Sequence, residues 1–196
     1  QTLGEQDGIV FLPAHLPSPR NYPANPYTPF RQNSHFLYYS GLQQPGLALL
    51  SYPDGRTVLF GREHTLDDVV WEGEQPSLHT LAARAEIQEV APLDLLPQAL
   101  QQAGDELRFL APFQPGLLLA MAGWLQTSVE ELKARESFAL KRAIVQQRLR
   151  KERAEVTEIE KALKLTGQLH HLCMERARPG MRESELWGRA SRRVIA

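Results

Sequence analysis

Apolar residues in the first third of the chain occur in short runs separated by polar and proline-rich segments. These runs predict β-strands, at residues 8–12, 36–39, 46–51 and 57–60. The sequence Tyr-Pro-Asp-Gly at 52–55 is typical of a tight turn, so the third and fourth strands are expected to form a hairpin. Residues 16–29 are rich in proline and are therefore expected to be an extended loop.

The spacing of apolar residues then becomes helical, with strand-like runs in between. Helices are predicted at 78–85 and 95–100, and strands at 87–90 and 107–110. The segment 117–134 reads as mostly helical with an interruption at Gly123, and 138–178 as one or two long helices that end at Pro179-Gly180. Alternating strands and helices predict an α/β fold with a mixed sheet flanked by helices.

The helix after residue 155 is amphipathic. One face carries apolar or small residues three or four apart: Val156, Ile159, Leu163, Thr166, Leu169, Cys173 and Ala177. This pattern predicts that the face is buried. The segment 181–196 is too short to cover it, so we expect the helix to belong to a second domain of which this chain holds only the start. Packing against the first domain or against another chain is the alternative.

Charge and cysteine content narrow the function classes. The formal net charge of the 196 residues is −1, which argues against a nucleic-acid-binding surface. No apolar stretch is long enough for a membrane-spanning helix. The single cysteine, Cys173, allows no intrachain disulfide and fits the cytoplasm. His170 and His171 are adjacent, so their side chains point about 100° apart on a helix and cannot share a metal ion.

Three segments together resemble one enzyme family. Residues 27–41 place Pro, Arg, Gln and Asn before an aromatic run, and 67–73 place a tryptophan and a glycine after acidic residues. A third segment begins with Arg-Leu-Arg-Lys at 148–151 and continues to the Pro-Gly turn within 174–181. The chain resembles the Xaa-Pro aminopeptidases (aminopeptidase P), proline-specific metallopeptidases whose second domain has the pita-bread fold. The Phe-Arg-Gln-Asn-Ser sequence at 30–34 favours aminopeptidases over prolidases or creatinases.

The resemblance implies a creatinase/prolidase-type N-terminal domain at 1–137, a linker helix at 138–151 and the start of a pita-bread catalytic domain at 152–196. In this family two Asp, one His and two Glu bind two divalent metal ions, usually manganese, and all five lie after the Pro-Gly turn. We therefore expect that this chain binds no metal and is inactive alone.

The resemblance also implies three substrate-pocket residues, each with a structural alternative. Trp71 would reach the pocket of a neighbouring subunit, or else it is a core aromatic residue. Asn25 matches a position where some relatives have an aspartate that contacts the amino end of the substrate across the subunit interface, so Asn25 would form a hydrogen bond there. The alternative is that it is a turn residue. Arg148 would line the pocket entrance, or else it lies on a helix surface. Residues 31–33 are expected to bond backbone carbonyls of the proline-rich loop.

The expected function is that of the N-terminal portion of a dimetal Xaa-Pro aminopeptidase, which removes the first residue from peptides with proline second. This portion would mediate homo-oligomerisation and active-site closure. The alternatives are a stand-alone, non-catalytic oligomerisation or binding module, and a prolidase-like dipeptidase parent. Neither nucleic acid nor a membrane is expected as a partner.

Overall fold

A mixed five-stranded sheet forms the centre of the computed structural model, which describes residues 8–22, 26 and 29–195. The strands are β1 (Ile9–Pro13), β2 (Ala48–Ser51), β3 (Thr57–Gly61), β4 (Glu89–Pro92) and β5 (Leu107–Arg108). Their order across the sheet is β4-β3-β2-β1-β5. The inner pairs β1–β2 and β2–β3 are antiparallel, whereas β5 and β4 run parallel to their neighbours. The mixed sheet confirms the predicted fold class.

Side chains alternate between the two faces of the sheet, as the period of two residues in a strand requires. Phe11 pairs with Leu50, which pairs with Val58, and all three contribute to one core cluster. The next row of the register, Leu12 with Leu49 and Leu59, contributes to a second cluster on the other face. Both faces are therefore covered, and the strands are apolar at successive positions instead of alternating with polar residues.

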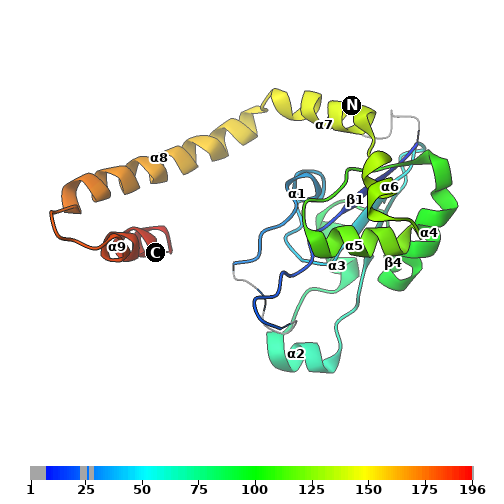
Figure 1. Ribbon diagram of the computed structural model, residues 1–196, viewed down its shortest axis with the longest axis horizontal. Helices are drawn as coiled ribbons and strands as arrows, with labels where there is room; N and C mark the ends of the chain where they lie inside the picture. Colours follow the sequence, from blue (N-terminus) through cyan, green and yellow to red (C-terminus); the bar gives the residue numbers. More distant parts are fainter. Residues whose placement is uncertain (1–7, 23–25, 27–28, 196) are drawn as a thin grey trace. The chain divides into compact units, whose positions relative to one another are not determined.

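Helices cover both faces of this sheet (Figure 1). One cluster includes side chains of α4 (Leu96–Ala103), α5 (Pro115–Trp124) and α6 (Val129–Ala134). The other includes side chains of α1 (Ser34–Ser40), α3 (Leu78–Arg84) and α7 (Phe138–Leu149). Short 3-10 turns, η2 (Leu93–Leu95) and η3 (Gly104–Glu106), flank α4. Each fully buried leucine or phenylalanine side chain in these two layers contributes about 1.5–3 kcal/mol of hydrophobic stabilisation.

The aromatic run at 36–39 is a helix, so the predicted strand is wrong. Asn33 caps helix α1: its side-chain oxygen accepts hydrogen bonds from the backbone N–H groups of His35 and Phe36, at 2.9 and 3.2 Å. Gly41 ends the helix in a left-handed conformation with φ 68°. Phe36 and Ser40, four residues apart, are the two residues of the helix that are buried. The aromatic residues favoured a strand, but the cap and the helical spacing of the buried positions decide the conformation.

The helices after residue 110 also differ from the prediction in detail. Gly123 lies inside α5, and the interruption comes after Trp124, where Gln126 has φ 51° and Ser128 caps α6. The long helical stretch divides into α7 and α8 (Arg153–Arg176), and α9 (Glu183–Ile195) follows. Sequence patterns also did not predict α2 (Leu66–Glu72).

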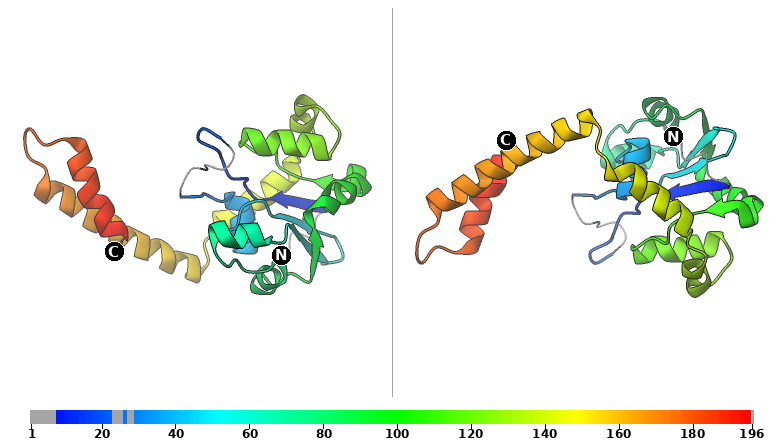
Figure 2. Two further views of the ribbon diagram at one scale, coloured as in Figure 1. Left: turned by 90° about the horizontal axis from the view of Figure 1, so that it is seen from below. Right: turned by 90° about the horizontal axis from the view of Figure 1, so that it is seen from above.

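The chain divides into two compact units, Gln1–Val145 and Gln146–Ala196. The division falls inside α7. In the second unit α9 folds back and packs against α8 (Figure 2). No residue of α8 is buried. On the face that the sequence predicts to be buried, Val156, Ile159 and Leu163 are exposed, whereas Leu169 and Cys173 are half-buried.

Candidate functional site

Helix α2 carries Trp71 and packs little against the rest of its unit. None of its residues is buried, and the Trp71 side chain is 86% exposed. Leu66 and Val70 on the same helix are 85% and 76% exposed. The alternative that Trp71 is a core aromatic residue is therefore wrong. An exposed indole beside two exposed aliphatic side chains is an unusual concentration of apolar surface on a seven-residue helix.

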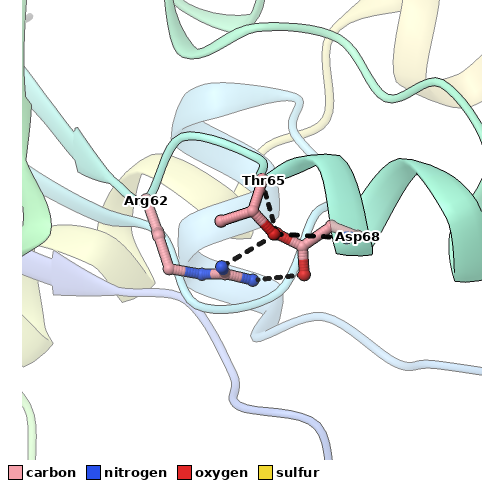
Figure 3. Close-up of polar contacts among 3 residues, drawn as sticks. All are labelled: Arg62, Thr65 and Asp68. Atoms are coloured by element: carbon pink, nitrogen blue, oxygen red, sulfur yellow. Dashed lines mark hydrogen bonds and ion pairs between the residues drawn. The ribbon is translucent and has the colours of Figure 1, made fainter.

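Polar contacts attach the start of α2 to the end of β3 (Figure 3). The two terminal nitrogens of the Arg62 guanidinium donate to the two Asp68 carboxylate oxygens at 2.9 and 3.0 Å. Asp68 also accepts from the Thr65 backbone N–H at 2.7 Å and from its hydroxyl at 2.9 Å. In return the Thr65 hydroxyl oxygen accepts from the Asp68 N–H at 3.2 Å, which completes a capping box.

The same contacts fix the charge of this cluster. The hydrogen bond from Arg62, followed by those from Thr65, holds the pKa of the Asp68 carboxyl far below its ordinary value. The hydrogen bond and the negative charge of Asp68 raise the pKa of Arg62. Both shifts favour the charged forms, so the two groups form an ion pair at neutral pH.

A hollow of about 320 Å³ lies next to the segment that carries α2. Its wall includes Arg62, His64 and Glu72 from that segment, and Leu78 and Leu81 from α3. The segment is therefore not packed tightly against α3 along its whole length. The start of the segment is joined to the end of β3 by polar contacts, and no residue of α2 is buried.

Two glutamine side chains hold the proline-rich segment. Gln32 accepts from the His15 N–H at 2.8 Å and donates to the Gln44 carbonyl at 2.7 Å. Gln114 accepts from the Leu16 N–H at 2.9 Å and donates to the Leu16 carbonyl at 2.6 Å. The expected bonds from residues 31–33 to carbonyls of the loop at 16–29 are not what the described residues form. Gln32 bonds His15 and Gln44, which lie outside that loop, and Asn33 caps α1. The role of Gln114 could not be found from the sequence, because 98 residues separate it from Leu16.

The other two predicted pocket residues are Asn25 and Arg148. Asn25 lies outside the described residues. Arg148 is half-buried in the last turn of α7 and belongs to the second compact unit, where its carbonyl accepts a hydrogen bond from the Lys151 ammonium. Its alternative role as a helix-surface residue stays open.

The described residues do not fit a pair of divalent metal ions. Within 8–22, 26 and 29–195, no three His, Cys, Asp or Glu side chains gather closely enough to hold one. No helix in the described part of the chain is long and apolar enough to cross a membrane.

The fold matches solved aminopeptidase structures. Zinc-substituted aminopeptidase P of Escherichia coli in complex with product superposes with a TM-score of 0.79 over 98% of this chain and 47% of that one, at 22% identity. Aminopeptidase PepP of Pseudomonas aeruginosa gives a TM-score of 0.78 over 97% of this chain and 45% of that one, at 25% identity. The class defined by the fold is therefore that of the N-terminal region of aminopeptidase P.

Sequence comparison leads to the same family. Residues 1–108 match the family described as "Aminopeptidase P, N-terminal domain", and the chain belongs to this family. A probable Xaa-Pro aminopeptidase, pepP, of Metarhizium acridum is 24% identical over 200 residues, which cover 100% of this chain and 38% of that protein. The chain thus spans less than half the length of the curated relatives it matches.

Proposed function

We propose that this chain is the N-terminal part of an Xaa-Pro aminopeptidase, which removes the first residue from peptides whose second residue is proline. Family membership and the names of the relatives support this activity for the parent protein. In this proposal residues 1–137 form the N-terminal domain, 138–151 the linker helix and 152–196 the start of the catalytic domain. Two divalent metal ions, manganese in our proposal, would be held by residues that this chain does not supply.

The N-terminal unit would act in a homo-oligomer, by closing the active site of a neighbouring subunit. The observation that carries this proposal is the exposure of Trp71 on a helix with no buried residue. A flat indole can pack against the ring of a substrate proline, and burying an aromatic side chain in such a contact is favourable. Asn25 would hydrogen-bond the amino end of the substrate, and Arg148 would line the entrance of the pocket.

The apolar stripe on α8 supports the division into two domains. The part of the apolar face of α8 that carries Val156, Ile159 and Leu163 is exposed, and an amphipathic helix requires a further surface to cover such a part. The remainder of the catalytic domain would supply this surface. The absence of disulfide partners for Cys173 supports a location in the cytoplasm.

The test is a Trp71→Ala substitution in the full-length protein, assayed on Xaa-Pro-Xaa peptides. We expect KM to rise roughly fivefold to a hundredfold, as for the loss of a substrate-contacting aromatic side chain, with a smaller change in kcat. Leu66→Ala, on the same helix and equally exposed, is the matched control for loss of apolar surface.

The outcomes separate the candidate functions. Unchanged kinetics in the Trp71→Ala protein would remove Trp71 from the pocket. Turnover of Xaa-Pro dipeptides but not of longer peptides would show a prolidase-like dipeptidase. A full-length protein without hydrolytic activity on either substrate, even with manganese added, would favour the stand-alone binding module.

A further inference from the structure

We propose that Arg62 and Asp68 are positioning residues that fix the orientation of helix α2 and, through it, the indole of Trp71. The kinetic part of this inference rests on the proposed role of Trp71. The structural part, that the ion pair holds α2 in place, can be tested without it.

Helix α2 cannot hold its own position. It has seven residues, and isolated helices of this length are unstable in water. A short helix in a protein is ordinarily held by a buried apolar face, yet no residue of α2 is buried. The hollow of about 320 Å³ beside the segment leaves part of it without packing partners. The attachment must therefore come from contacts at the ends of the helix.

The Arg62–Asp68 pair has the geometry for such an attachment. Arg62 follows directly after β3, so its backbone is held by the sheet, and Asp68 lies in the first turn of α2. Two parallel hydrogen bonds join the fork of the guanidinium to the carboxylate, which restrains direction as well as distance. The same carboxylate bonds Thr65, so it joins Arg62, the cap residue and the first turn of the helix.

Trp71 follows Asp68 by three residues and therefore lies close to the same side of the helix, one turn along. A small rotation of α2 about its attachment would move the indole by several ångströms. A substrate pocket completed by this side chain would thus depend on the ion pair, although neither charged group would touch the substrate.

The test uses Arg62→Gln, Asp68→Asn and the double variant in the full-length protein. Asp67→Asn is the matched control, because it removes an equal charge from the same turn of α2 and lies outside the Arg62 contact. Hydrogen exchange of the amides at 63–73 is measured against those of α3, together with kcat and KM on Xaa-Pro-Xaa peptides.

We expect exchange at 63–73 to accelerate about two- to fivefold in each single variant, with α3 unchanged and the Asp67→Asn protein like the parent. KM should rise by a similar factor at nearly constant kcat. The double variant should be no worse than Asp68→Asn alone, because that change already removes the Arg62 contact together with the carboxylate that bonds Thr65. Arg62→Lys should have a smaller effect on exchange and on KM than Arg62→Gln. Lysine keeps the positive charge but cannot form two parallel hydrogen bonds to the carboxylate.

Three results would overturn the inference. Unchanged exchange at 63–73 in the Asp68→Asn protein would show that the pair does not hold α2. Faster exchange with unchanged KM, in a protein whose KM responds to Trp71→Ala, would show that the attachment does not position the indole. Additive effects in the double variant would show that the two residues act separately. If Trp71→Ala leaves KM unchanged, the proposed role of Trp71 is refuted. The exchange measurement then still shows whether the Arg62–Asp68 pair holds α2 in place.

Discussion

Gln32 provides the most quantitative test of how the proline-rich segment is held. Its side-chain oxygen accepts from the backbone N–H of His15, and its nitrogen donates to the carbonyl of Gln44. These bonds join segments that are 17 and 12 residues away in sequence. The same side-chain oxygen also accepts from the Asn33 N–H at 2.8 Å. Each of the three bonds contributes about 0.5–1.5 kcal/mol net, so Gln32→Ala should lower the free energy of unfolding by about 1.5–4.5 kcal/mol.

A Gln32→Glu variant tests the orientation of the amide. It keeps an acceptor for the His15 N–H but places a carboxylate oxygen against the Gln44 carbonyl, where the amide donates at 2.7 Å. Two facing acceptors repel, so this variant should be destabilised at neutral pH by an amount similar to Gln32→Ala. The deficit should shrink in acid, because a protonated carboxyl group can donate to the carbonyl.

Urea unfolding followed by fluorescence measures both effects. Trp124 packs edge-on against Phe11, with ring centroids 6.4 Å apart, and so reports on the core of the N-terminal unit. The exposed Trp71 and Trp187 change their surroundings less on unfolding. Gln102→Ala, at an exposed position of α4, is the control and should stay within about 0.5 kcal/mol of the parent. A Gln32→Ala protein as stable as this control would refute the reasoning.

Two further predictions concern helix caps. Asn33→Ala should lower the free energy of unfolding by about 1 kcal/mol, because α1 loses its cap. Asn33→Asp keeps the acceptor oxygen and should stay close to the parent. If thermal unfolding does not distinguish the two variants, Asn33 is not the cap of α1. Hydrogen bonds from Ser128 and Thr127 lower the pKa of Glu131, so its contribution to stability is present above the ordinary glutamate pKa and is lost as pH falls below it. Glu131→Gln should therefore flatten the acid side of the stability–pH curve, and a variant curve as steep as that of the parent would refute the assignment.

The strands were predictable because burial on both faces leaves continuous apolar runs in the sequence. Residues 8–12 and 57–60 correspond closely to β1 and β3. The strand predicted at 36–39 is wrong for a local reason. The aromatic run is compatible with either a strand or a helix, and the Asn33 cap that decides between them is only one polar residue in the sequence. Local patterns cannot decide such cases without the tertiary contact of Phe36.

The candidate site was predictable only in part. Resemblance identified Trp71, but its exposure required the structure, since the neighbouring pattern was equally consistent with a core residue. Arg62 was not found, because its partner Asp68 is recognisable only when the turn before α2 brings the two together. Gln114 was missed for the same reason over a much longer separation.

The order of the strands also limits how copies of the chain could associate. In the described sheet, β5 forms one edge with two residues and β4 forms the other with four, ending at Pro92. Such short edges, one of them ending in a residue without a backbone N–H, are poor templates for pairing with a strand of another molecule. Extension of the sheet from one subunit into the next is thereby disfavoured. An assembly would instead use contacts between side chains, which can be specific for one partner where backbone pairing is not.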